Sequence, residues 1–203
     1  MGLDLDGTLL DCRARQVALA AHLAGSLDEA AFWAAKRAGA TTAAALAAQD
    51  APDVSAAWVE QIEDERWLAL DAPLPGVDSS LAELRGAGFD PFVLTARRHP
   101  ERVAAQVERL GLAPPAVVSP AAAAREKADV LRQLDAAGLI GDTESDLEAA
   151  RAAAVPCELV STGQRDAAFL RAQGATGIHD SLAHAVAALV ARIAAGASNS
   201  GRT

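Results

Sequence analysis

Short apolar segments alternate with helix-like segments over the last two-thirds of the chain. Segments with strand character lie at 92–95, 116–118, 139–140, 158–160 and Ile178. Segments with helix character lie at 77–85, 101–110, 121–137, 145–154, 166–172 and 182–195. This alternation is typical of parallel strands joined by right-handed helical crossovers. The pattern predicts an α/β fold with a doubly wound parallel sheet, followed by a disordered tail at 196–203 that is rich in Gly, Ser and Asn.

The segment at 13–72 differs from the rest of the chain. It is rich in Ala, holds all three Trp residues and has no run of Val or Ile long enough for a strand. Ser26 and Glu29 have the spacing of a capping box, which predicts the start of a helix. We therefore expect residues 13–72 to form a compact helical insert, and residues 1–12 and 73–203 to form the α/β core.

Charge and composition narrow the classes of function. The chain has 18 Lys and Arg against 27 Asp and Glu, a formal charge of −9 and a pI of about 4.9. Such an acidic balance disfavours general binding to nucleic acid or to anionic membranes, because both need a basic face. With four Phe, three Trp and no Tyr, few rings are available to stack on bases. We expect neither a nucleic-acid partner nor a membrane partner.

The amino terminus and the cysteines indicate the compartment. Nothing resembles a signal peptide, and no apolar run approaches the roughly 20 residues of a membrane span. Cys12 and Cys157 have no metal-ligand spacing and are expected to be reduced thiols. We therefore expect a cytoplasmic protein that is a monomer or a small homo-oligomer.

Residues that carry chemistry follow several of the predicted strands. In a doubly wound sheet, ligands bind beyond the carboxyl ends of the strands. The candidates there are Asp4 and Asp6 after the first strand, Thr95, Ala96 and Arg97 after the strand at 92–95, Lys127 on a helix, and Asp142 and Asp146 after the strand at 139–140. Lys127 is one of only two lysines, against sixteen arginines. Four aspartates, one lysine and one threonine are thus expected to converge on one edge of the sheet.

These residue types indicate phosphoryl chemistry. Several carboxylates in one crevice repel each other unless a cation binds or some stay protonated. Mg²⁺ prefers oxygen ligands and can bridge carboxylate and phosphoryl oxygens. Asp4 can then attack phosphorus and form an aspartyl-phosphate, while Asp6 can protonate the leaving oxygen and later deprotonate the water. Thr95 and the Ala96 amide can hydrogen-bond the phosphoryl oxygens, whose charge Lys127 would balance.

The order of these motifs resembles that of the haloacid dehalogenase-like (HAD) hydrolase superfamily. The resemblance is carried by Asp4-Leu5-Asp6-Gly7-Thr8-Leu9, Thr95, Lys127, Gly141, Asp142 and Asp146, and it covers nearly the whole chain. It implies that Asp4 is the nucleophile, that Asp6 is the general acid and base, and that Asp4, the Asp6 carbonyl and Asp142 are Mg²⁺ ligands. Asp146 would complete the metal site by holding a metal-bound water or Lys127.

The resemblance is greatest to the phosphoglycolate phosphatase-like and β-phosphoglucomutase-like branch, which carries a helical cap where the insert at 13–72 falls. It implies a Mg²⁺-dependent phosphatase that acts on a small phosphorylated metabolite, with the cap closing over the site. A phosphomutase of the same superfamily is the first alternative, because the motifs do not reveal whether the phosphoryl group is returned. A non-catalytic relative that binds a phospho-ligand is the second.

Several basic residues lie outside the shared motifs. Arg97 and Arg98 are interpreted as contacts to the phosphate or to a second anionic group of the substrate, or else as solvent-facing residues. Lys36 and Arg37 of the insert either reach the site or lie on a solvated face, and we expect the solvated face. Dehalogenase and phosphonatase activities are disfavoured because Asp6 is present.

Overall fold

The computed structural model describes residues 1–112, 116–118 and 123–200. Its main sheet has six strands in the order β5-β4-β1-β6-β7-β8, and every neighbouring pair is parallel. The strands are β1 Gly2–Leu3, β4 Phe92–Leu94, β5 Ala116–Val118, β6 Leu139–Gly141, β7 Cys157–Val160 and β8 Ile178–His179. Strand order reverses on either side of β1, as in a doubly wound sheet. The predicted α/β fold class is confirmed.

Helices cover both faces of this sheet. They are α6 Val77–Gly86, α7 Pro100–Arg109, α8 Ala124–Gln133, α9 Glu144–Ala153, α10 Ala167–Ala172 and α11 Leu182–Ser200. Successive strand residues point to opposite faces, so Val93 packs in the cluster with α6, α7 and α11, whereas Phe92 and Leu94 pack with α8 and α9. Both faces are therefore buried, which explains why the strands are short apolar runs.

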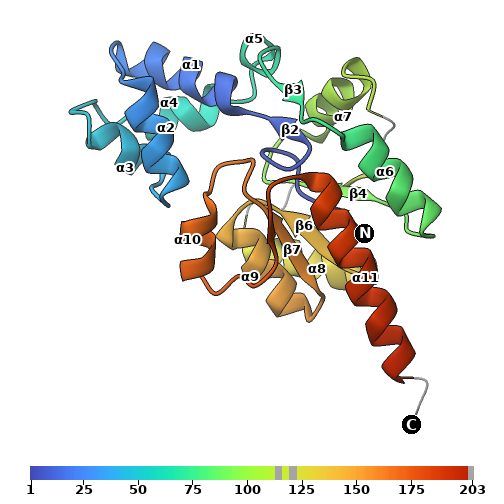
Figure 1. The fold of residues 1–203 in the computed structure, drawn as a ribbon. Coiled ribbons are helices and arrows are strands. Elements are labelled where there is room, and N and C mark those ends of the chain that lie inside the picture. Colours follow the sequence, from blue (N-terminus) through green and yellow to red (C-terminus); the bar gives the residue numbers. More distant parts are fainter. Residues whose placement is uncertain (113–115, 119–122, 201–203) are drawn as a thin grey trace.

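A group of short helices interrupts the core after the first strand. They are α1 Arg13–Ala24, α2 Glu29–Arg37, α3 Thr42–Ala47, α4 Ser55–Gln61 and α5 Glu65–Leu68. Figure 1 shows them outside the sheet. Helices α1 to α4 share a small core of their own that includes Phe32, Trp33 and Leu46. The chain leaves and re-enters the core through an antiparallel pair, β2 Leu10–Asp11 and β3 Ala72–Pro73. Residues 13–71 thus form a helical insert.

Three predicted element boundaries differ from the structure. Asp28, not Ser26, caps α2, because its carboxylate accepts from the Ala31 amide at 2.9 Å. The helix expected at 121–137 ends at Gln133, where Leu134 leaves the helix and Asp135 has a left-handed φ of 46°; residues 121 and 122 lie outside the described residues. The tail expected to be disordered is helical to Ser200, because extending a formed helix adds one hydrogen bond per residue. Residues 201–203 lie outside the described part.

Two further expectations concern the cysteines and membrane spans. Cys12 and Cys157 are both free thiols, as expected. Among the described helices, none combines the length and the hydropathy that crossing a membrane requires.

Candidate active site

The carboxyl ends of β1, β4 and β6 bring the predicted residues to one edge of the sheet. Leu3 pairs with Val93 on one side and with Ile140 on the other. Asp4 therefore leaves the sheet beside Asp142, and its amide donates to the Ile140 carbonyl at 2.9 Å. Thr95 follows β4 at the same edge and is buried.

Asp4, Lys127, Asp142 and Asp146 form a compact charged group, here called the Asp4 cluster. The Lys127 Nζ lies 2.7 Å from an Asp4 carboxylate oxygen and 2.6 Å from an Asp146 carboxylate oxygen. One oxygen from each of the three aspartates lies within 4.8 Å of the other two. All four side chains are buried. The cluster thus sets three carboxylates against one ammonium.

This imbalance changes the protonation of the aspartates. Burial raises the pKa of Asp4 to about 7, against the opposing effect of Lys127. Burial, together with the charges of Asp4 and Asp146, also raises the pKa of Asp142 well above its usual range. Lys127 shows the converse, because Asp146 and Asp4 outweigh its burial and raise its pKa. The negative charge of the three carboxylates is therefore only partly balanced by the Lys127 ammonium, and a bound cation would balance it further.

Asp142 shows where a cation would fit. Its Oδ2 accepts from the Gln164 amide at 2.6 Å, but its buried Oδ1 has no hydrogen-bond partner among the described residues. Two glycines let the backbone approach this carboxylate: a Cβ would lie 2.2 Å from Asp142 Oδ2 at Gly7, whose φ is +95°, and 2.0 Å from it at Gly163. An unpartnered carboxylate oxygen among other carboxylates fits a hard divalent cation.

Asp146 anchors the loop and Lys127. Its Oδ1 accepts from Lys127, and its Oδ2 accepts from the Thr143 hydroxyl at 2.7 Å and from the Thr143 amide at 3.1 Å. Thr143 is the N-cap of α9. Asp146 was expected to hold either a metal-bound water or Lys127, and its observed contact is with Lys127.

Asp6 lies two residues after Asp4 but belongs to a different group. Its carboxylate forms ion pairs with Arg15, at 2.6 Å, and with Arg97. Asp71 pairs with the same two arginines, at 3.0 and 2.9 Å. We call these four residues the Asp6 ring. Burial alone would raise the pKa of Asp6, but the two guanidinium groups outweigh it and hold that pKa well below its usual range.

The ring corrects the expectation that Arg97 binds phosphate. All three of its guanidinium nitrogens donate to protein groups, namely Asp6, Asp71 and the Gln106 side chain. Its side chain is buried, so the solvent-facing alternative is also wrong. The Arg97 amide donates to the Thr95 hydroxyl at 3.3 Å, while Ala96 between them is exposed. The Arg98 side chain is exposed, as the solvent-facing alternative expects, and the residue contacts Glu63 and the Val59 carbonyl of the insert.

Two insert residues face the core, contrary to the expected solvated face. Lys36 is only 5% exposed and donates to the Thr42 hydroxyl at 2.9 Å. Burial lowers its pKa to about 8. Arg37 donates to the carbonyls of Ser161 and Gly163, so it ties α2 to the loop that packs against Asp142.

Sequence reasoning missed Arg15, Asp71 and Gln106. None belongs to a recognisable motif, and the sequence offers one signal for two of them. Arg15 and Asp71 stand near the two ends of the insert, where a charged residue can reach back to the core.

These features define a recognisable class of enzyme. The parallel α/β sheet carries an acidic cluster with a buried lysine at the carboxyl end of its central strand, and a helical insert follows that strand. Residues 2–154, well over half of the chain, match the family model of the haloacid dehalogenase-like hydrolases. The chain belongs to this family, and the expectation of a HAD-like hydrolase is confirmed.

Solved structures with the same fold agree with this assignment. A protein assigned as a phosphoglycolate phosphatase from Lactobacillus delbrueckii subsp. bulgaricus is 19% identical over 93% of this chain and 96% of its own, with a TM-score of 0.69. A HAD family hydrolase from Deinococcus radiodurans, solved with bound phosphate and sodium, is 19% identical over 95% of each chain, with a TM-score of 0.70. A protein assigned as a β-phosphoglucomutase from Thermotoga maritima is 18% identical over 93% and 96%, with a TM-score of 0.61. No curated protein is similar enough in sequence to be matched.

Proposed function

We propose that this protein is a Mg²⁺-dependent phosphatase that hydrolyses a small phosphomonoester through an aspartyl-phosphate on Asp4. The observation that carries the proposal is the Asp4 cluster, in which three carboxylates and Lys127 meet at the end of β1 and leave a buried Asp142 oxygen unpartnered. The phosphate bound to the Deinococcus radiodurans family member supports a phosphorylated substrate. Asp4, the Asp6 carbonyl and Asp142 would hold the metal, which when bound supplies charge neutralisation and Lewis-acid polarisation of the phosphoryl group.

In the first half of the reaction, a carboxylate oxygen of Asp4 attacks phosphorus while the bond from phosphorus to the leaving oxygen breaks. Asp6 donates a proton to that oxygen, and for this step it must be in its protonated form, although Arg15 and Arg97 favour its carboxylate. Lys127 stays bonded to Asp4 and Asp146 and offsets the negative charge of the phosphoryl oxygens. The Thr95 hydroxyl and the Ala96 amide stand at the adjacent strand end, where both would donate hydrogen bonds to those oxygens.

In the second half, a water molecule attacks phosphorus and gives its proton to Asp6. The bond from Asp4 to phosphorus breaks, inorganic phosphate leaves, and both aspartates return to their starting state. The observed Asp6 carboxylate, held by two arginines, is in the form that accepts this proton. A phosphoenzyme that is hydrolysed in this way requires a water that is positioned, not merely present.

The helical insert would act as the cap of this site. Arg37 docks on the loop carrying Gly163, and Glu63 accepts from the Arg98 and His99 amides at the start of α7. The insert therefore contacts the core on both sides of the Asp4 cluster. A cap so placed would exclude bulk water from the first step and select among leaving groups.

A phosphomutase is the alternative with a specific observation behind it, because a protein assigned as a β-phosphoglucomutase shares the fold. In that case Asp4 would return its phosphoryl group to a second hydroxyl of the substrate instead of to water. The two functions are separated by the product, which is inorganic phosphate for a phosphatase and an isomeric phosphate ester for a mutase.

Phosphate release from small phosphomonoesters and p-nitrophenyl phosphate, with Mg²⁺ or with EDTA, tests the proposal. We expect release that depends on Mg²⁺ and falls at least about 10³-fold in Asp4→Asn. Asp129→Asn, which changes an exposed aspartate on α8, should keep the wild-type rate. Absence of release from every ester by folded wild-type protein would contradict the phosphatase, and isomerisation without release would favour the mutase.

A further inference from the structure

The Asp6 ring is a closed cycle of alternating charges. Arg15 bonds Asp6 and Asp71, and Arg97 bonds the same two aspartates, so that each member contacts two others. Arg97 also donates to Asp6 through its Nε at 3.0 Å, which gives a two-pronged contact. Two carboxylates face two guanidinium groups, and their formal charges cancel. Nothing in the ring calls for a further ion.

Burial shows which member of the ring faces the site. The side chains of Arg15, Arg97 and Asp71 are 2%, 4% and 0% exposed, whereas that of Asp6 is 18% exposed. Asp6 is therefore the one member that can meet a substrate or water, and the other three lie behind it. Because both Asp6 oxygens accept from a rigid guanidinium plane, the carboxylate has one defined orientation.

The ring joins parts of the chain that come from both sides of the insert. Arg15 lies on α1 just after the chain enters the insert, Asp71 lies between α5 and β3 where it returns, and Arg97 follows β4 in the core. Arg15 also donates to the Ile62 carbonyl at 3.2 Å, within the insert. The orientation of Asp6 thus depends on residues that belong to the two connections between insert and core.

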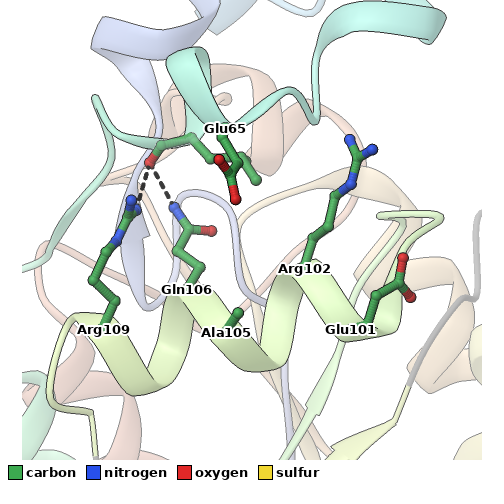
Figure 2. A pocket seen from close by; sticks show the side chains of 7 residues that line it. Glu65, Glu101, Arg102, Ala105, Gln106 and Arg109 are labelled. Atoms are coloured by element: carbon green, nitrogen blue, oxygen red, sulfur yellow. Dashed lines mark hydrogen bonds between the residues drawn. The ribbon is translucent and has the colours of Figure 1, made fainter.

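Gln106 on α7 fastens this arrangement from behind. Its Nε2 donates to Asp71 and to the Leu68 carbonyl, both at 2.9 Å, and its Oε1 accepts from Arg97. Figure 2 shows Gln106 beside Arg109, with both side chains donating to the same carbonyl, that of Leu68. These residues help to line a cavity of about 320 Å³ between α5 and α7. None of the residues that line this cavity belongs to the Asp4 cluster.

We propose that Arg15, Asp71 and Arg97 are positioning residues that aim Asp6 at the water of the second half-reaction and make this aim depend on how the insert is seated. The inference rests on the proposed phosphatase function. None of the three is proposed to touch the substrate, and each acts through Asp6. Asp71 is the clearest case, because it contacts both arginines but not Asp6 itself.

Pre-steady-state kinetics with p-nitrophenyl phosphate separate this role from a merely structural one. Nitrophenolate leaves without needing a proton, so formation of the phosphoenzyme depends little on Asp6, whereas its hydrolysis needs Asp6 to orient the water. In Arg97→Lys and Asp71→Asn we expect the ratio of the phosphorylation rate to the hydrolysis rate to rise at least about tenfold over wild type, seen as a burst of nitrophenolate. Arg102→Lys is the matched control, since Arg102 also bonds the insert, at the Glu63 carbonyl, but lies outside the ring.

The outcomes are distinguishable. Folded variants that slow both steps equally, or lose active protein without a burst, would overturn the positioning role while leaving the phosphatase intact. Wild-type protein that turns over no phosphomonoester would overturn the proposed function and the positioning role with it. If Arg97→Lys does not fold, Asp71→Asn carries the test.

Amide hydrogen exchange gives a readout that needs no activity. Arg97 lies in the core, yet we expect Arg97→Lys to speed exchange in α1 and α5 of the insert, whereas an exposed change, Arg132→Lys, should not. Unchanged exchange in both helices would overturn the link between the ring and the seating of the insert.

Discussion

The Asp4 cluster and the Asp6 ring begin two residues apart in the chain, yet their charges are organised in opposite ways. The cluster sets three buried carboxylates against Lys127 and leaves an oxygen of Asp142 without a hydrogen bond. The ring sets two carboxylates against two guanidinium groups, and each of its ions is paired twice. One group is incomplete without a ligand and the other is complete in itself.

The difference follows from what burial costs. A buried charge without a partner is strongly destabilising, so a chain keeps an unbalanced group only where a ligand completes it. A balanced, fully bonded group does not need a ligand and instead holds its members in one geometry. A buried cluster with uncompensated charge thus indicates a binding site. A neighbouring cluster whose charges cancel indicates residues that hold a catalytic group in one orientation.

The largest expected effect comes from making the Asp4 cluster more unbalanced. Lys127→Met removes its only ammonium, and Asp4 and Asp146 then repel each other without compensation. We expect phosphate release to fall at least about 10³-fold. We also expect a loss of about 3 kcal/mol of unfolding free energy in EDTA, partly restored by Mg²⁺. Urea denaturation with and without Mg²⁺ measures the loss of unfolding free energy and its recovery. Equal stability of the variant in the two conditions would contradict the interpretation of the cluster as a cation site.

Breaking the ring should cost stability that Mg²⁺ does not restore. Asp71→Asn leaves two buried guanidinium groups facing one carboxylate, so we expect a loss of about 3 kcal/mol. Because Arg15 and Asp71 are in contact, the double variant Arg15→Met/Asp71→Asn should lose less than the sum of the single losses, by at least about 1 kcal/mol. A double-mutant cycle in urea measures this coupling, and strict additivity would show that the ring is not a unit.

A smaller effect is expected from crowding the Asp142 carboxylate. A Cβ at Gly163 would lie 2.0 Å from Asp142 Oδ2 and 2.6 Å from the Gly7 backbone, so Gly163→Ala must displace that side chain. We expect Mg²⁺ affinity to fall by about 10- to 100-fold, as when a group that orients a metal ligand is changed. Gly86→Ala, where a Cβ would meet nothing within 4 Å, is the matched control for calorimetric titration. Equal Mg²⁺ affinities in the two variants would contradict the role of Gly163 in letting the backbone approach the Asp142 carboxylate.

The smallest effect concerns Lys36, a buried charge that belongs to neither group. Among the described residues it has no carboxylate within ion-pair distance; the charges of Arg165 and Arg15 oppose its own, and that of Asp142 favours it. Burial lowers the pKa of Lys36 to about 8 in the folded protein, whereas a lysine in an unfolded chain has a pKa of about 10.4. Between these values the unfolded chain binds more protons, so stability rises with pH there and the penalty is full below about pH 8.

Lys36→Met should remove that penalty. We expect the variant to be about 2 kcal/mol more stable than wild type near pH 7, with the gain shrinking towards about pH 10.5. Lys36→Arg retains the charge and should show no such gain. Urea denaturation across this range provides the measurement, and a gain that does not change with pH would mean that packing, not charge, sets the stability.

The strand-end residues could be predicted from the sequence because spacing alone places them. Asp4, Lys127, Asp142 and Asp146 follow apolar strands or lie on a helix next to one, and parallel strands end at one edge. The structure brings these four together as that argument predicts. The sequence also predicts which core segments are helices and which are strands, since the spacing of apolar residues and the positions of turn residues agree there.

The ring could not be predicted, because its members depend on how the insert returns to the core. Arg15 and Asp71 are 56 positions apart, and nothing in their local sequence shows that they meet. Arg97 follows a motif residue, so a phosphate contact was the natural expectation, but Asp71 and Gln106 supply its partners instead. Lys36 was expected in solvent because its local sequence does not show that the Thr42 hydroxyl and the Phe32 and Trp58 rings surround its ammonium.

Calorimetric titration of Mg²⁺ into wild type, Asp142→Asn and Asp71→Asn tests the contrast between the two groups most directly. The account predicts one Mg²⁺ bound by wild type and by Asp71→Asn, and no measurable binding by Asp142→Asn, whose side chain keeps its shape but loses its charge. Binding that persists in Asp142→Asn, or that is lost equally in Asp71→Asn, would contradict the claim that the Asp4 cluster is the cation site and the Asp6 ring is complete without one.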